Sequence, residues 1–189
     1  RLAVRWNLSV EAEQLWQRVA KNAPMRREAL EALSRIYRAS NDLPRLLEIA
    51  KQLHESSPRE APLTANYARL ALLIAPNTQQ AQRAAKEAYD AEPQDVSCAV
   101  TYAFALYGLG RTAEGLEILR TLPHDALLDS HAAVYAVALL LDDDKRVLAD
   151  EYIAAARGGP LFPEEKKLLD EAINRAALAS PATIPSPSP

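Results

Sequence analysis

Residues 62–95 read PLTANYARLALLIAPNTQQAQRAAKEAYDAEPQD, and residues 96–129 read VSCAVTYAFALYGLGRTAEGLEILRTLPHDALLD. Both stretches are 34 residues long, and each predicts a helix, a short turn and a second helix. When they are aligned, small or apolar residues fall at matching places: Ala65, Ala68, Leu72, Ala81, Ala85 and Ala88 in the first, and Ala99, Tyr102, Leu106, Gly115, Leu119 and Leu122 in the second. A fixed period of this size indicates a repeat protein in which neighbouring helix pairs stack on one another.

The same register continues on both sides of these stretches. Residues 27–60 repeat it upstream, residues 130–163 repeat it downstream, and residues 1–26 carry the second half of a further unit. Within that partial unit we expect the end of a first helix over 1–6, a turn over 7–9 and a helix over about 10–22. Because the chain begins in mid-repeat and without Met, we expect further sequence upstream.

The pattern over residues 1–163 resembles the tetratricopeptide repeat, whose signature is W-x2-L-G-x2-Y…A-x3-F…P over 34 residues. The Trp of that signature is Ala or Leu here, and the position of its closing Pro, which is Pro93 in the first stretch, is Leu127 in the second. The resemblance implies an all-α fold, an α-solenoid of antiparallel helix pairs wound into a right-handed superhelix. We expect Ala65, Ala68, Ala85 and Ala88 to be deeply buried where the helices approach closely.

The C-terminal part of the chain differs from the repeats. Residues 163–178 predict a helix with one apolar stripe and a polar opposite side, as a terminal capping helix requires. Residues 179–189 form a Pro/Ser-rich tail, which favours polyproline II or disorder over a packed core. We predict that this tail docks in an apolar groove of its own or a neighbouring molecule.

Composition and charge exclude some partner classes. The net charge of −3 gives no general attraction to nucleic acid or to an anionic membrane, and no apolar run is long enough to span a bilayer. Residues 1–58 carry 10 basic and 7 acidic side chains, a net of +3, so the remaining residues carry a net of −6. Cys98 is the only cysteine and falls inside an apolar helix, where a thiol is usually inert. The compartment stays undetermined.

No pattern in the sequence points to catalysis. His54, His124 and His131 have no partner at metal-ligand spacing, and the chain lacks nucleotide-binding, hydrolase and zinc-protease motifs. The acidic run over residues 142–144 lacks the alternating ligands and the glycine of a calcium loop, so a solvated turn is expected there. We therefore expect no catalytic residue, no metal ion and no cofactor.

The resemblance also implies an inner, concave surface lined by the second, fifth, ninth and twelfth residues of each unit. This surface begins charged in residues 27–60 and becomes apolar afterwards. From it we predict a partner-binding groove: Leu63, Asn66, Leu70, Leu73, Val100, Phe104, Tyr107, Val134 and Ala138. Two interpretations stay open, because these residues either belong to the core of a tightly wound array or are covered by a polypeptide. The groove lacks the Lys/Asn set with which family members hold a C-terminal carboxylate.

The predicted function is a protein–protein interaction scaffold that binds a protein or peptide segment in this groove and has no catalysis of its own. One alternative is a helper or regulatory domain of a larger enzyme whose catalytic part lies upstream. Another is an RNA-binding helical repeat, suggested by the arginines of residues 26–45. Basic charge stops after the second unit, however, whereas RNA-binding arrays carry it throughout. Self-association through the N-terminal end is a further possibility.

Overall fold

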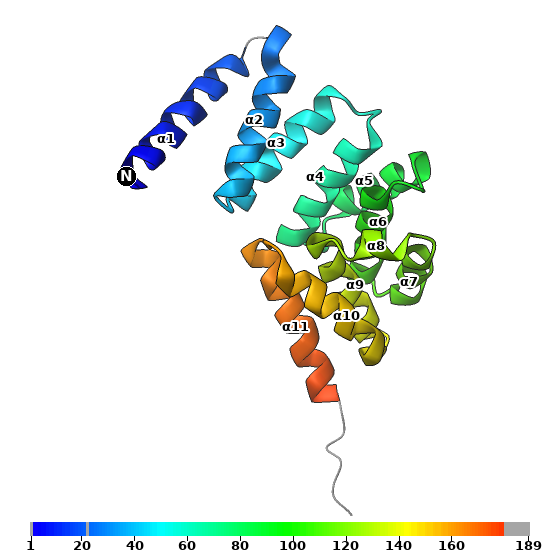
Figure 1. Cartoon of the computed structure of the whole chain (residues 1–189). Helices are drawn as coiled ribbons and strands as arrows, with labels where there is room; N and C mark the ends of the chain where they lie inside the picture. Colours follow the sequence, from blue (N-terminus) through cyan, green and yellow to red (C-terminus); the bar gives the residue numbers. More distant parts are fainter. Residues whose placement is uncertain (1, 22, 180–189) are drawn as a thin grey trace, which may run out of the picture.

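The computed structural model describes the backbone of residues 2–21 and 23–179 and the side chains of residues 10–21 and 24–179 (Figure 1). All regular elements in these ranges are helical. They are α1 (Leu2–Val19), the short 3-10 helix η1 (Ala23–Met25), α2 (Arg26–Ala39), α3 (Leu43–Ser56), α4 (Ala61–Ile74), α5 (Gln79–Ala91), α6 (Val96–Gly108), α7 (Thr112–Arg120), α8 (His124–Leu127), α9 (Ser130–Asp142), α10 (Arg146–Gly158) and α11 (Pro163–Ala179). The predicted tail lies outside the described residues.

Adjacent helices pack as pairs along a curved path, as Figure 1 shows from the blue N-terminal helices to the orange C-terminal one. The pairs are α2–α3, α4–α5, α6–α7 and α9–α10, and they correspond to the four predicted repeats. Successive pairs also contact one another, through α4 and α6 and through α6 and α9. The fold is therefore the expected all-α solenoid. The short helix α8 is an addition that the 34-residue period did not predict.

Aspartates fix where three of the helices begin. The side chain of Asp42 accepts a hydrogen bond from the backbone N–H of Arg45, and Asp95 accepts one from Cys98. Asp129 accepts two, from the N–H groups of the first residues of α9. An acidic N-cap satisfies backbone donors that have no partner inside the helix and complements its dipole. These caps mark the N-terminal ends of α3, α6 and α9.

The N-terminal expectation was wrong in one respect. Residues 2–19 form one continuous helix, with no turn at residues 7–9. Asn7, Leu8 and Ser9 include neither Gly nor Pro, and Asn or Ser costs a helix only a few tenths of a kcal/mol, so packing on α2 is sufficient to keep the helix intact. Val10 and Leu15 are exposed on this helix, while Trp16 packs partly against the core. Self-association through this end stays a prediction.

Small residues at the predicted places allow the helices to approach closely. Ala65, Ala68, Ala85 and Ala88 are all buried, with at most 1% of their surface exposed, which confirms the expectation. Gly115 is the tightest of these positions. A Cβ built on it would lie 2.5 Å from the Cδ2 atom of Leu139 and 2.9 Å from the backbone oxygen of Ala103. The crossing of α7 with α6 and α9 therefore has no room for a methyl group.

Replacing Gly115 by Ala should destabilise the protein. The steric cost of overpacking, about 1–3 kcal/mol, exceeds the gain in helix propensity of up to about 1 kcal/mol. Gly158→Ala is the matched control, because a Cβ at that helical glycine meets no atom within 4 Å. Urea denaturation followed by circular dichroism measures both. A Gly115→Ala variant as stable as Gly158→Ala would contradict the packing at this crossing.

Candidate functional site: the inner face of the solenoid

The inner face, formed by α2, α4, α6 and α9, is covered at its C-terminal end by α11. This last helix packs along α9 and reaches α4, whereas α10, its neighbour in sequence, is not among its main partners. Figure 1 shows α11 beside α9. The predicted capping helix thus lies across the inner helices. Its buried side includes Leu169, Ala172 and Ala176, and the two residues before it, Leu161 and Phe162, are buried as well.

A buried carboxylate holds the start of α11 in this position. The Glu165 side chain is completely buried and accepts four hydrogen bonds, two on each oxygen. Oε1 accepts from Arg69 Nη1 at 3.1 Å and from the Tyr135 hydroxyl at 2.9 Å. Oε2 lies 2.7 Å from His131 Nδ1 and accepts from the backbone N–H of Phe162 at 3.1 Å. We call Arg69, His131, Tyr135, Glu165 and this N–H the Glu165 cluster.

The partners of Glu165 come from two different repeats. Arg69 belongs to α4, and its other guanidinium nitrogen, Nη2, donates to Asn66 Oδ1 at 3.2 Å. His131 and Tyr135 are one helical turn apart on α9. The cluster therefore joins α4, α9 and α11, which are separated by up to 96 residues in sequence. A buried charge with all its lone pairs satisfied fixes a unique arrangement, because the carboxylate finds this set of donors only here.

The electrostatics of the cluster favour the ionised carboxylate. Burial alone raises the pKa of Glu165, but the hydrogen bond and charge interaction with His131, the charge of Arg69 and the Phe162 N–H outweigh it. The net effect is a pKa below the usual value. Burial is also the main reason that the pKa of Tyr135 is raised, so its hydroxyl remains a neutral donor. The cluster thus combines a carboxylate and a guanidinium in a site that excludes water.

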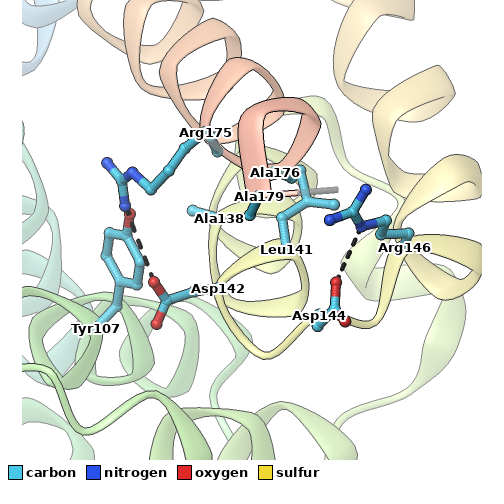
Figure 2. A pocket seen from close by; sticks show the side chains of 10 residues that line it. Tyr107, Ala138, Leu141, Asp142, Asp144, Arg146, Arg175, Ala176 and Ala179 are labelled. Carbon is cyan, nitrogen blue, oxygen red and sulfur yellow. Dashed lines mark hydrogen bonds and ion pairs between the residues drawn. The ribbon is translucent and has the colours of Figure 1, made fainter. Parts of the chain in front are cut away.

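The other end of α11 borders a small cleft of about 210 Å³ (Figure 2). Arg175 of α11 donates to the Tyr107 hydroxyl at 3.1 Å and lies 3.9 Å from Asp142 Oδ1. The exposed ion pair between Arg146 and Asp144 stands at the opposite side of the cleft. The floor is made of alanines and Leu141. This cleft lies at the C-terminal end of α11, where Ala172, Ala176 and Ala179 line it.

The structure separates the nine predicted groove residues into two groups. Five are buried, and α11 or neighbouring inner helices fill the space in front of them: Leu70, Val100, Phe104, Val134 and Ala138. Four are only partly buried: Leu63, Asn66, Leu73 and Tyr107. The Phe104 ring packs at a tilt against the Tyr135 ring, with centroids 4.6 Å apart, and the Tyr107 hydroxyl accepts a hydrogen bond from Arg175. The core interpretation thus applies to the five buried residues, and a polypeptide that covers the other four stays a prediction.

The part of the inner face that remains open lies over α2 and α4. Arg35 and Arg38 of α2 are exposed, and the charge of Arg38 interacts with Arg69 and Glu165 across the face. Leu63 and Leu73 stand on α4 and are partly buried. At the far edge, Arg27 pairs with Glu60 and Glu31. A cationic, partly apolar surface is thus available next to the covered one.

Sequence reasoning missed the Glu165 cluster, although one signal was present. Glu165 stands four residues before Leu169 and seven before Ala172, so it lies on the apolar stripe of α11. A carboxylate at such a position either reaches solvent near the end of the helix or is paired with a donor in the protein interior. Nothing in the sequence identifies Arg69 as its partner. His131 was predicted on the inner face, but without its role.

Other chemistry-bearing groups have structural surroundings. Cys98 is buried, and burial raises the pKa of its thiol to about 12, so it is a poor nucleophile. His54 stacks on Tyr67, and His124 contacts Tyr152 and Glu151. Within residues 2–21 and 23–179, no three His, Cys, Asp or Glu side chains gather as a metal site. Over the same residues, none of the helices combines the length and the hydropathy needed to cross a membrane.

These features define a class: a helical-repeat solenoid whose inner face is partly occupied by its own last helix. Comparison with known families agrees, because residues 72–140 match the family model described as tetratricopeptide repeat. The match runs from the end of α4 into α9 and confirms the resemblance on which the fold was predicted. Neither the curated proteins nor the solved structures gave a match to the chain. Tetratricopeptide repeats generally mediate protein–protein interaction, and this repeat type is a scaffold.

Proposed function

We propose that this chain is an interaction scaffold that binds a polypeptide along the open part of its inner face, over α2 and α4, and that it performs no catalysis itself. One observation carries the proposal. α11 and the packed core cover the inner face over α6 and α9, whereas Arg35 and Arg38 are exposed and Leu63 and Leu73 are half-buried on the part next to it. A surface that combines apolar contacts with charged groups at its edge is the usual composition of a protein interface.

Of the nine predicted groove residues, this proposal keeps those that lie on the open surface. Leu63, Asn66 and Leu73 stay as partner contacts, with Arg35 and Arg38 added from α2. Tyr107 lies at the distant edge beside Arg175 and would contact only a longer partner. The role of an upstream enzyme part stays a prediction. RNA binding is disfavoured, because Glu28, Glu31 and Glu60 border the same cationic surface and would repel phosphates.

The test is affinity capture with the full chain and two matched charge-reversal variants. Arg35→Glu/Arg38→Glu changes the open inner face, and Arg83→Glu/Arg157→Glu makes the same charge change on exposed residues of α5 and α10. Two interface contacts worth about 1 kcal/mol each would weaken binding by more than tenfold. We expect polypeptides captured by the parent to be lost with the inner-face variant and kept with the control. Equal capture by both variants would refute the proposal, and nuclease-sensitive capture would favour RNA.

A further inference from the structure

α11 lies on the inner face in the way that a bound helix would. It uses one apolar side against α9, and its opposite side is polar and exposed, including Lys166, Lys167, Asp170 and Glu171. The helices of the repeats, by contrast, pack both within their pair and on the next pair, as α6 does with α7 and with α9. α10, in contrast, is not among the main packing partners of α11. Its attachment to the rest of the protein is therefore that of a helix in a groove.

The connection from α10 to α11 directs the chain onto this surface. It contains Gly159, where a Cβ would lie 2.4 Å from Ser130 Oγ and 2.5 Å from Ser130 Cβ. Only glycine fits so close to the start of α9. The chain thus turns at the edge of the inner face, and Leu161 and Phe162 enter it before α11 begins. The Phe162 ring lies 5.7 Å from the His131 ring, measured between centroids.

The surface under α11 has a defined chemical preference. Its apolar part, from Val134, Val137 and Ala138, receives the side chains of Leu169 and its neighbours. Its polar part offers Arg69, the Tyr135 hydroxyl and His131 to one carboxylate. If an occupant lacked the carboxylate, Arg69 would remain desolvated with only Asn66 and Tyr135 as partners. A buried site built around a hydrogen-bonded charge discriminates strongly against an occupant that lacks the matching group.

We propose that this surface of α9 and α4 is a binding site for an amphipathic helix with a glutamate one turn before its apolar stripe. α11 occupies the site within the chain, and a partner helix with the same pattern binds by replacing it. The bound glutamate takes the place of Glu165 against Arg69, Tyr135 and His131. This site adjoins the open surface over α2 and α4 at Asn66, which accepts a hydrogen bond from Arg69, but it differs from that surface in its occupant and in its test.

The main experiment measures whether the sequence of α11 binds in trans. The probe is a fluorescein-labelled peptide of residues 160–179, PLFPEEKKLLDEAINRAALA, and its control is the same peptide with Glu165→Gln. Fluorescence anisotropy gives the affinity of each peptide for the full-length parent and for full-length Glu165→Gln. Because occupancy by α11 lowers the apparent affinity, we expect the glutamate peptide to bind the Glu165→Gln chain at least tenfold more tightly than the parent. We expect the glutamine peptide to bind that chain at least tenfold more weakly than the glutamate peptide.

Two further measurements place the peptide on the proposed surface. Ala138 of α9 and Ala172 of α11 line the same cleft, which makes Ala138→Cys/Ala172→Cys in the Glu165→Gln chain the pair to test for a disulfide that locks α11 in place. The oxidised chain should lose peptide binding and regain it on reduction. If Glu165→Gln does not fold, hydrogen exchange on the parent replaces the affinity measurement. There, excess glutamate peptide should speed the exchange of the amides of α11, and the glutamine peptide should not.

Three results would overturn the proposal. One is the absence of binding to a folded Glu165→Gln chain. Another is equal affinity of the two peptides, and the last is binding that the disulfide lock leaves unchanged. In the exchange experiment, protection of the α11 amides that persists at saturating peptide would also overturn the proposal. Arg38 interacts with Glu165, so the charge reversal on α2 is also made as Arg35→Glu alone. Capture by this single variant reports on the open surface and not on the Glu165 cluster, so failure of this site and failure of the open surface are distinguishable.

Discussion

Replacing Glu165 by Ala is expected to lower the free energy of unfolding by about 3–5 kcal/mol, because it removes one partner of a buried ion pair and leaves the other without compensation. The Glu165 side chain is 0% exposed and that of Arg69 is 12% exposed, so neither charge is screened by water in the way that a surface pair is. Tyr135, His131 and the Phe162 N–H lose their acceptor at the same time. Urea denaturation followed by circular dichroism measures the effect.

The control is Glu171→Ala on the same helix. Glu171 is exposed, and its ion pair with Lys167 is long, at 3.8 Å. Its loss should therefore change the free energy of unfolding by less than about 0.5 kcal/mol. A second comparison uses Arg69→Met with Glu165→Leu, which removes both charges together. Because no unpaired charge remains, this double variant should be more stable than Glu165→Ala alone. A Glu165→Ala chain within 1 kcal/mol of the parent would show that the cluster does not hold α11.

The place where the lost stability appears is also informative. α11 contacts only α9 and α4 among its main partners, so it can open as a unit while the repeats stay folded. In Glu165→Ala, amide exchange should then accelerate first in α11 and only later in α4 and α6. Uniform acceleration in all helices would indicate instead that the cluster stabilises the whole array. Faster exchange in α11 before the other helices is the pattern required for a helix that a partner can replace.

The repeats could be predicted from the sequence because their signal is local and repeated. Ala81, Ala85 and Ala88 stand at helical spacing, and the same positions recur 34 residues later. Helix ends followed from short-range rules, and Asp95 and Asp129 act as the caps that such rules predict. The turn expected at residues 7–9 failed because Asn and Ser are only weak helix breakers. Packing of α1 on α2 decided the outcome there.

The position of α11 could not be predicted because it depends on a long-range pair. Its apolar stripe fits a helix at the end of the array as well as one on the inner face. The difference lies in Glu165 and Arg69, which are 96 residues apart and follow no sequence spacing rule. Part of the predicted groove therefore has a different environment from the one expected: Val134 and Ala138 were predicted to line an open concave surface, and both are buried. Gly159 indicates a turn after α10, but it does not indicate the direction that the chain takes from there.

Acid should loosen α11, and it should do so through Glu165. The pKa of this carboxyl is lower in the folded protein than in the unfolded chain, where a glutamate has a pKa of about 4.3. A carboxyl whose pKa is lowered by folding contributes its full stabilisation at pH values above its pKa in the unfolded chain. That contribution declines as the pH falls below about 4.3 and is gone once the pH passes the folded pKa. Each unit by which the pKa is lowered corresponds to about 1.4 kcal/mol.

The measurement is the difference in unfolding free energy between the parent and Glu165→Gln, followed from pH 7 to pH 3. Glutamine resembles the protonated carboxyl, and all other acidic groups are shared, so their titration cancels. Of the groups that face Glu165, Arg38 and Arg69 stay charged over this range and Tyr135 stays neutral, because burial raises its pKa. His131 is kept in both proteins, because its hydrogen bond and charge are the largest contributions that lower the pKa of Glu165. We expect the difference in unfolding free energy to decrease steadily below about pH 4.3, with faster exchange of the amides of α11 over the same interval. Parallel stability curves down to pH 3 would mean that the buried carboxylate does not hold this helix in place.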